Sequence, residues 1–314
     1  MARELPRRSF LQAGAAALTG FAAGAVAVPA APLQQPAATT RTQFQIACMT
    51  LPYAQFPLQR ALTGIREAGY RYVALYTTHR ENGKPVSILP ADAPPDRARD
   101  LATRCRDLGL EPVLMFSGIY PEAKNGLEVL RQRILQASAG KIAQVLTFGH
   151  TKGGNHHLWV DRFRQLGPIA RQNGVLLVVK QHGGETGSGV ACARITREIN
   201  DAGIKVNYDA GNVMDYLQID PLPDIRACAD EVRSFCIKDH RNFPGPHQDC
   251  GPGLGEIDHY RLLHPVAFTG RPMPLCCENI FAPRVPRPTQ PEGIDALARR
   301  AREFLELVVQ GIQA

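Results

Sequence analysis

The chain has 314 residues, a formal net charge of +7 at pH 7 and eight cysteines, and 44% of its residues are hydrophobic. Its basic residues are scattered: no block of five or six Lys or Arg occurs, and no basic stretch alternates with aromatic residues. This distribution argues against a nucleic-acid partner. The length beyond residue 42 fits one large α/β domain better than two average ones.

The first 31 residues have the pattern of a twin-arginine export signal. The adjacent Arg7 and Arg8 precede an uncharged Ala/Gly-rich run from Ala13 to Val28, and small residues of the Ala-x-Ala kind follow. We therefore assign 1–31 to a signal peptide and 32–42 to a linker. The alternative is an uncleaved membrane anchor, although the run is shorter than the roughly 20 apolar residues of a spanning helix. We expect a periplasmic or extracytoplasmic protein with no transmembrane segment in its mature part.

The cysteines do not form a recognisable disulfide or metal framework. No Cys-x-x-Cys occurs, and Cys48, Cys236 and Cys276 lie in apolar runs where a thiol packs as a small hydrophobe. We expect these three in the core, while pairing among Cys192, Cys228 and Cys250 stays open.

From residue 43 onward, short apolar runs alternate with longer segments of helical period. Eight runs are predicted as strands: Phe44–Cys48, Tyr72–Leu75, Pro112–Phe116, Ile142–Thr147, Val175–Lys180, Lys205–Asp209, Ser234–Lys238 and Pro274–Glu278. The predicted helices are Leu58–Ala68, Pro95–Leu108, Leu127–Ala139, Trp159–Asn173, Ala191–Ala202 and Ile294–Val309. Glycines 69, 109, 140, 174 and 203 each stand just before a strand. The pattern predicts one (β/α)8 TIM barrel over 43–314. A doubly wound sheet is the alternative, but no Gly-x-Gly-x-x-Gly follows the first strand.

Polar side chains end the last four predicted strands. Side chains alternate between the two faces of a strand. On each of these four strands, the residues that share one face end in a polar or charged group. The carboxyl ends of barrel strands form the active-site face, so we expect these groups to converge there. They are Lys180, His182, Asp209, Lys238 and Glu278.

Five motifs in this half of the chain resemble those of a known family. They are "VVKQHGG" (178–184), "VNYDAGN" (206–212), "CIKDH" (236–240), "GPGLGEID" (251–258) and "LCCENI" (275–280). Their order and spacing are similar to the xylose isomerase-like TIM-barrel superfamily, whose members are often labelled sugar phosphate isomerase/epimerase. The resemblance implies a divalent ion, commonly Mn, Mg, Co or Zn, held by four side chains. Asp209 and Glu278 match two of these ligands, but Lys180 stands in place of the family's Glu and Cys236 in place of its His.

The two replacements leave two interpretations of the site open. A protonated Lys180 about 4 Å from a cation would repel it by about 4 kcal/mol at an effective dielectric of about 20. A reduced metal site could still use Asp209, Glu278 and His182, with Cys236 as a possible fourth ligand that favours Zn. Alternatively the site works without metal, and a lysine whose pKa is lowered by its like-charged neighbour acts as base or forms an imine.

The resemblance implies a carbohydrate-active isomerase or epimerase that abstracts a proton next to a carbonyl. Such a reaction needs a base and an electrophile. We assign Glu278 as base or metal ligand, Lys238 and Lys180 as electrophiles, and His182 as a proton carrier. Candidates for binding substrate oxygens are Arg241, His240 and Asn207.

An exported enzyme of this kind would meet a free sugar or keto-sugar rather than a cytoplasmic sugar phosphate, and no Gly-rich phosphate loop is present. The alternatives are a lyase or dehydratase acting on keto-sugars and a sugar-binding barrel without catalysis. An endonuclease IV-like phosphodiesterase is disfavoured because the chain offers too few metal ligands.

Overall fold

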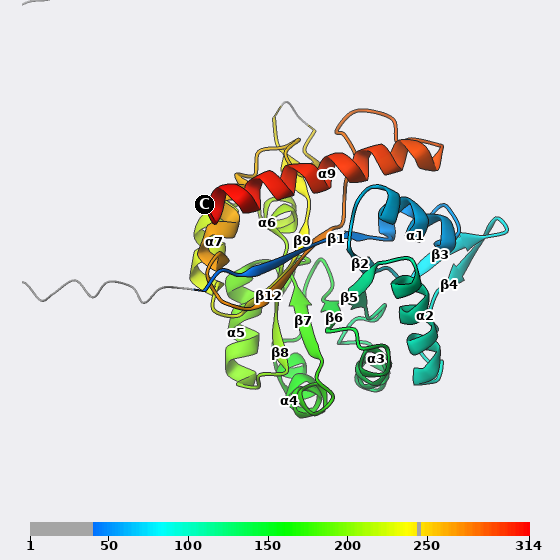
Figure 1. The fold of residues 1–314 in the computed structure, drawn as a ribbon. Helices are drawn as coiled ribbons and strands as arrows, with labels where there is room; N and C mark the ends of the chain where they lie inside the picture. Colours follow the sequence, from blue (N-terminus) through cyan, green and yellow to red (C-terminus); the bar gives the residue numbers. More distant parts are fainter. Residues whose placement is uncertain (1–39, 244–245) are drawn as a thin grey trace, which may run out of the picture. The chain divides into compact units, whose positions relative to one another are not determined.

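The computed structural model describes residues 40–243 and 246–314. The predicted signal peptide and nearly all of the predicted linker lie outside these residues. Eight parallel strands close into a barrel in the order β1-β12-β9-β8-β7-β6-β5-β2. These strands are β1 (Gln43–Met49), β2 (Tyr72–Leu75), β5 (Glu111–Phe116), β6 (Gln144–Phe148), β7 (Leu176–Lys180), β8 (Ile204–Tyr208), β9 (Val232–Ile237) and β12 (Pro272–Cys277). The predicted TIM barrel is confirmed (Figure 1).

Helices follow most strands and cover the outside of the barrel (Figure 1). They are α1 (Leu58–Glu67), α2 (Pro95–Asp107), α3 (Gly126–Gly140), α4 (His156–Gln172), α5 (Gly189–Ile199), α6 (Ala210–Leu217), α7 (Pro221–Cys228), α8 (His259–Leu263) and α9 (Pro291–Ile312). Short 3-10 helices occur at Leu51–Tyr53 and His264–Val266. The sequence pattern does not predict α6, α7 and α8, because each has only five to eight residues and so shows little helical period.

Two antiparallel hairpins extend from the barrel. β3 (Thr78–Glu81) pairs with β4 (Lys84–Ser87), and β10 (Asp239–Arg241) pairs with β11 (Gln248–Cys250). The β10-β11 hairpin follows β9 directly, so it rises from the carboxyl ends of the strands. It places His240 opposite Asp249.

The core has two parts, as a closed barrel requires. A large apolar cluster fills the space between the strands and the helices, and a smaller one fills the barrel interior. Val178, Cys236 and Cys276 belong to the interior cluster. The alternation of the sequence therefore identified the inward face of β7, β9 and β12 correctly. All eight cysteines are buried and free, so none of the open pairings forms.

The five glycines before the predicted strands serve two purposes. Gly69, Gly109 and Gly174 have positive φ, the conformation that glycine readily adopts after a helix. Gly140 and Gly203 do not; a Cβ on Gly203 would lie 2.3 Å from the carbonyl oxygen of Gly167. At Gly203 close backbone packing, rather than a left-handed turn, requires glycine, and a Cβ on Gly140 would lie 3.0 Å from the carbonyl oxygen of Ala98.

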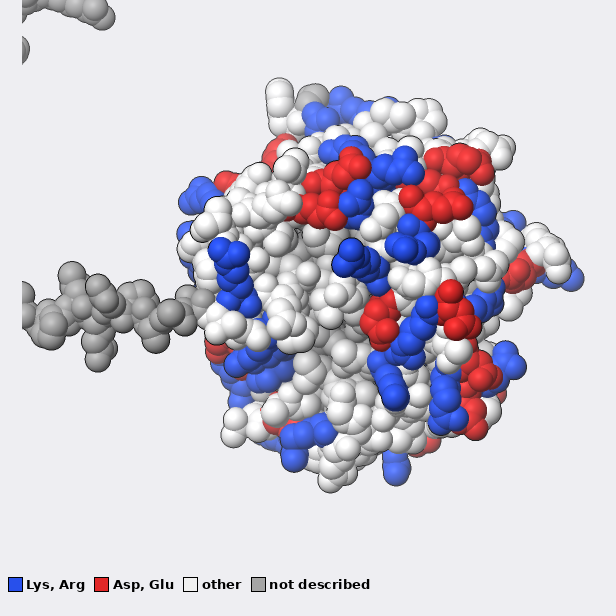
Figure 2. Space-filling model, viewed as in Figure 1, with Lys and Arg blue, Asp and Glu red and all other residues white. Residues whose placement is uncertain are grey.

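The visible surface carries charges of both signs. On the face shown in Figure 2, acidic and basic side chains are interspersed rather than gathered in one basic patch. Among residues 40–243 and 246–314, no helix is long and apolar enough to cross a membrane.

Candidate active site

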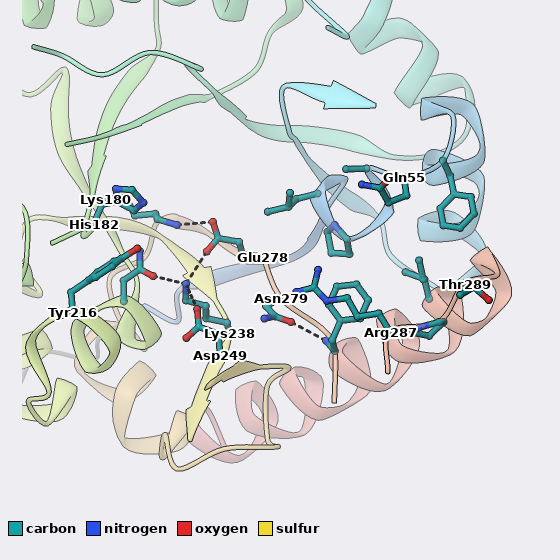
Figure 3. A pocket seen from close by; sticks show the side chains of 18 residues that line it. Gln55, Lys180, His182, Tyr216, Lys238, Asp249, Glu278, Asn279, Arg287 and Thr289 are labelled. Carbon is teal, nitrogen blue, oxygen red and sulfur yellow. Dashed lines mark hydrogen bonds and ion pairs between the residues drawn. The ribbon is translucent and has the colours of Figure 1, made fainter. Parts of the chain in front are cut away.

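Four charged side chains from four neighbouring strands meet at the carboxyl end of the barrel. The Nζ of Lys180 lies 2.6 Å from Oε1 of Glu278 and 3.0 Å from Oδ2 of Asp209. The Nζ of Lys238 lies 3.3 Å from Oε2 of Glu278 and 3.4 Å from Oδ2 of Asp209. We call these four residues the central cluster. Figure 3 shows the two lysines reaching Glu278 from different sides.

Local structure after β8 fixes one side of the central cluster. Asp209 is the N-cap of α6, and its Oδ1 accepts a hydrogen bond from the Asn212 backbone N–H at 2.9 Å. Gln181 accepts the backbone N–H of Asp209 through its side-chain oxygen at 2.6 Å. Asn212 donates to the carbonyl of Gln181 and accepts a hydrogen bond from Lys238. One oxygen of Asp209 is therefore used by the helix, while the other, Oδ2, faces the two ammonium groups.

The protonation states of the central cluster follow from burial and mutual charge. Burial alone would lower the pKa of Lys180 and Lys238, but Asp209 and Glu278 outweigh it and raise the pKa of both lysines. Burial would raise the pKa of Glu278, but the two ammonium groups lower it well below its usual range. Burial raises the pKa of Asp209 in spite of the same lysines. The cluster therefore holds two ammonium groups and an ionised Glu278.

These directions correct one expectation. The sequence suggested that each lysine would lower the pKa of the other, which would allow an imine or a lysine base. The structure adds a third carboxylate, because Oδ2 of Asp249 lies 2.9 Å from the Nζ of Lys238. Three carboxylates around two lysines reverse the expected shift.

His182 supplies a neutral imidazole beside the central cluster. Burial and the charge of Lys180 lower its pKa. Its Nδ1 lies 2.8 Å from the carbonyl oxygen of Gly149, so in the neutral ring Nδ1 is the donor and Nε2 carries the free lone pair. The ring packs on Phe148 with 4.5 Å between centroids and edge-on to Tyr216 at 5.4 Å. His182 is thus held as a potential proton acceptor.

A cavity of about 750 Å³ opens in front of these groups. Lys180, Lys238, His182 and Glu278 line one end of it. Figure 3 shows that Arg287 reaches into the same space from the segment before α9. A volume of this size is typical of small-molecule sites, and charged donors and acceptors at one end can orient a polyhydroxylated ligand.

Three residues predicted to bind substrate do not line this cavity. Asn207 is fully buried one layer below Asp209, where it donates to Ser234 at 2.7 Å and accepts the Cys236 N–H at 3.1 Å. His240 is fully buried against Asp249. The guanidinium of Arg241 donates to the carbonyl of Phe243 at 3.2 Å.

The sequence patterns did not point to several polar residues that line the cavity, among them Asn212, Tyr216, Asp249 and Arg287. The first two lie on α6, one and two turns after its capping residue Asp209, so recognising that cap could have located them. Asp249 and Arg287 come from the β10-β11 hairpin and the long loop before α9. Loop residues follow neither a helical nor a strand period, so the sequence pattern does not predict where they lie.

The central cluster does not suit the divalent ion that the family resemblance implies. Asp209, Cys236 and Glu278 do offer potential ligand atoms within 4.8 Å of one another. His182 is not part of this group. However, the oxygens of both carboxylates already contact ammonium groups, and burial raises the pKa of the Cys236 thiol, which opposes the thiolate that metals bind. The two carboxylates are therefore paired with the ammonium groups of the two lysines, and this arrangement suits them better than binding one divalent ion.

Several solved structures are similar to this one. An L-ribulose 3-epimerase shares 18% identity at a TM-score of 0.64, over 87% of this chain and 96% of that chain. A Mycobacterium smegmatis protein in complex with magnesium shares 17% at 0.66, over 88% and 98%. A fusion of a xylose isomerase-like TIM barrel with 4-hydroxyphenylpyruvate dioxygenase shares 20% at 0.64; 87% of this chain matches 45% of the fusion. At these identities the similarity shows the fold.

Sequence comparison gives the family. No curated protein matches the chain. A family model described as xylose isomerase-like TIM barrel matches residues 62–305, which is most of the described barrel. The chain therefore belongs to the xylose isomerase-like TIM-barrel family.

Proposed function

We propose that the protein is a carbohydrate-active isomerase or epimerase that abstracts a proton next to the carbonyl of a free sugar or keto-sugar. The observation that carries this proposal is the pair of ammonium groups, Lys180 and Lys238, held beside an ionised Glu278 and a neutral His182 at one end of a cavity. Removal of such a proton needs a base and a group that stabilises the oxyanion. The site offers both.

The lysines act as electrophiles in this proposal. Their raised pKa keeps them protonated, which favours hydrogen bonding to a carbonyl oxygen and opposes imine formation, since an imine requires a neutral amine. When the C–H bond breaks, its electron pair moves onto the carbonyl oxygen, and the ammonium groups stabilise the resulting enediolate. They supply two positive charges, which is the charge that a divalent ion brings to related sites.

Glu278 and His182 carry the proton. Glu278 accepts it from carbon once substrate oxygens take over its contacts with the two ammonium groups, which hold its pKa low in the free site. His182 Nε2 moves protons between substrate oxygens or returns a proton to the neighbouring carbon. Both line the same cavity and flank the lysines (Figure 3). A route with two proton carriers serves isomerisation as well as epimerisation, because each reaction removes one proton and delivers another.

The expected substrate is a free carbohydrate met outside the inner membrane. The twin-arginine pattern of the first 31 residues supports export, and the absence of a Gly-rich phosphate motif from the sequence supports an unphosphorylated sugar. The similarity in fold to an L-ribulose 3-epimerase supports a ketose.

The test is proton exchange in D2O. The full chain is incubated with a panel of free ketoses and aldoses, and NMR and mass spectrometry follow deuterium at the carbon next to the carbonyl. We expect deuterium incorporation together with an epimer or isomer. Loss of water to give a deoxy-keto product would instead assign a dehydratase. Saturable binding without exchange would assign a sugar-binding barrel.

A further inference from the structure

A second group of potential ligands lies beside the central cluster and takes no part in the proposed reaction. Asp215 on α6, His240 on β10 and His247 just before β11 each offer a ligand atom, and these atoms lie within 4.8 Å of one another. Nδ1 of His247 is 3.1 Å from Oδ1 of Asp215, and the two imidazole rings are 5.6 Å apart between centroids. We call these three residues the rim cluster.

His240 has the environment of a metal-binding histidine. Its side chain is fully buried, and its Nδ1 lies 2.8 Å from Oδ1 of Asp249. Its other nitrogen, Nε2, is buried without a hydrogen-bond partner among the described residues. Histidine ligands commonly bond a carboxylate through one nitrogen and bind the metal through the other. An unpartnered buried nitrogen is otherwise unfavourable, and an ion would satisfy it.

We propose that the rim cluster binds one transition-metal ion, with zinc as the expected species. Two imidazoles and one carboxylate form a ligand set that zinc accepts in three-ligand sites, with a fourth position left for water. Thiolate is absent from the set, and imidazole suits zinc far better than Mg or Ca. Because 53% of the His247 side chain and 30% of the Asp215 side chain are exposed, the fourth position faces solvent.

One pair of ligands in the rim cluster already has the spacing that zinc requires. Ligand atoms about 2.0–2.1 Å from a tetrahedral zinc lie roughly 3.3 Å from one another. The His247–Asp215 contact of 3.1 Å already has that length. The ion would replace the hydrogen bond that these two side chains make in its absence.

A bound ion would join α6 to the β10-β11 hairpin at the edge of the cavity. Asp249 connects the rim cluster to the central cluster, because Oδ1 contacts His240 and Oδ2 contacts Lys238 at 2.9 Å. The rim site is nevertheless separate in its ligands from the Asp209, Cys236 and Glu278 group. The two groups can therefore be distinguished by substitution.

The experiment is zinc titration of the chelator-treated full chain against a chromophoric competitor. We expect one zinc per chain, an affinity reduced by at least ~100-fold in His247→Ala and Asp215→Asn, and a roughly 10–100-fold loss in Asp249→Asn, which removes the carboxylate behind His240. His157→Ala removes another exposed histidine and serves as control, with no expected change. Glu278→Gln, in the central cluster, should also keep the zinc.

Three results would overturn the rim site. The first is no zinc uptake by the wild type. The second is unchanged affinity in His247→Ala, a variant of an exposed residue that should fold normally. The third is loss of zinc in Glu278→Gln with retention in His247→Ala, which would place the ion in the central cluster. Because the readout is binding, the result does not depend on the proposed sugar chemistry.

Discussion

The barrel buries lysine–carboxylate contacts at both of its ends, and the two ends differ in kind. At the amino end of the strands, Nζ of Lys205 on β8 lies 2.9 Å from Oε2 of Glu231, which also accepts a hydrogen bond from Thr196. We call Lys205 and Glu231 the lower pair. Its charges cancel one to one, and neither residue lines the cavity. The central cluster instead places two lysines and two carboxylates in front of an open volume, with Asp249 as a third carboxylate beside Lys238.

The ion pair at the amino end stabilises the fold, whereas the cluster at the carboxyl end is arranged to meet a substrate. The lower pair uses the same residue types, but its two charges neutralise only each other. In the central cluster each carboxylate is shared between two ammonium groups, so a substrate oxygen can take over part of a contact without leaving a charge unpaired. This agrees with the general rule that the carboxyl end of a TIM barrel carries activity and the amino end carries stability.

The largest expected difference is in catalysis. Glu278→Gln preserves shape but removes the proton acceptor and the charge that holds both lysines, so kcat should fall by about 10²–10⁴-fold. Glu231→Gln makes the same chemical change in the lower pair and should leave kcat within a few-fold of the wild type. The rate of deuterium exchange with the active sugar measures both. Equal losses in the two variants would remove the distinction between the ends.

A second expected effect concerns metal. Lys180→Glu combined with Cys236→His places at these positions the residues that the family resemblance implies. Without metal, the new carboxylate repels Asp209 and Glu278 by about 4 kcal/mol for a pair ~4 Å apart at a dielectric of ~20, so the variant should unfold at a lower temperature. Mn²⁺ at about 100 times its Kd should return roughly 2.7 kcal/mol.

The control for the metal effect is Lys205→Glu, which also places a new carboxylate beside an existing one, in this case Glu231. It should be destabilised and should gain nothing specific from Mn²⁺. Thermal unfolding with and without Mn²⁺ gives both results. If the restored variant shows no Mn²⁺ stabilisation, Lys180 is not what keeps a divalent ion from the central cluster.

The sequence allowed the barrel and the central cluster to be predicted because both depend on regular repeats. Strand alternation placed Lys180, Lys238 and Glu278 toward one mouth, and barrel geometry brought them together. The protonation of the lysines could not be predicted in the same way. It depends on how many carboxylates surround each ammonium, and Asp249 comes from a hairpin that pairs across a proline- and glycine-rich turn.

The sequence also did not predict at which level of the barrel each residue of a strand lies. Asn207 shares a face with Asp209 but lies one layer lower, where Ser234 and Cys236 use both ends of its amide. Arg241 and His240 follow β9 in the hairpin, which turns them away from the cavity. Alternation predicts the face of a strand, while the layer depends on where the strand ends in space.

A third, smaller effect is on stability. Lys205→Met leaves the Glu231 carboxylate with Thr196 as its remaining side-chain partner. Loss of a hydrogen bond to a charged group should lower the free energy of unfolding by about 1–3 kcal/mol. Urea unfolding measures this change, and activity at a temperature where the variant is folded should match the wild type. A large loss of activity would mean that the lower pair contributes to the chemistry after all.

The smallest expected effect is in the pH profile. Burial and Lys180 lower the pKa of His182, so its ring is neutral at pH 7 and becomes protonated only as the pH falls below the ordinary value of about 6.5. If neutral His182 carries the proton, kcat/KM should be constant through neutral pH and should fall with a midpoint below about 6.5. The activity that remains in His182→Gln should lack this acid limb. A midpoint above 6.5 would contradict the assignment and indicate His240: burial alone would lower the pKa of His240, but its bond to Asp249 and the nearby acidic charges raise it.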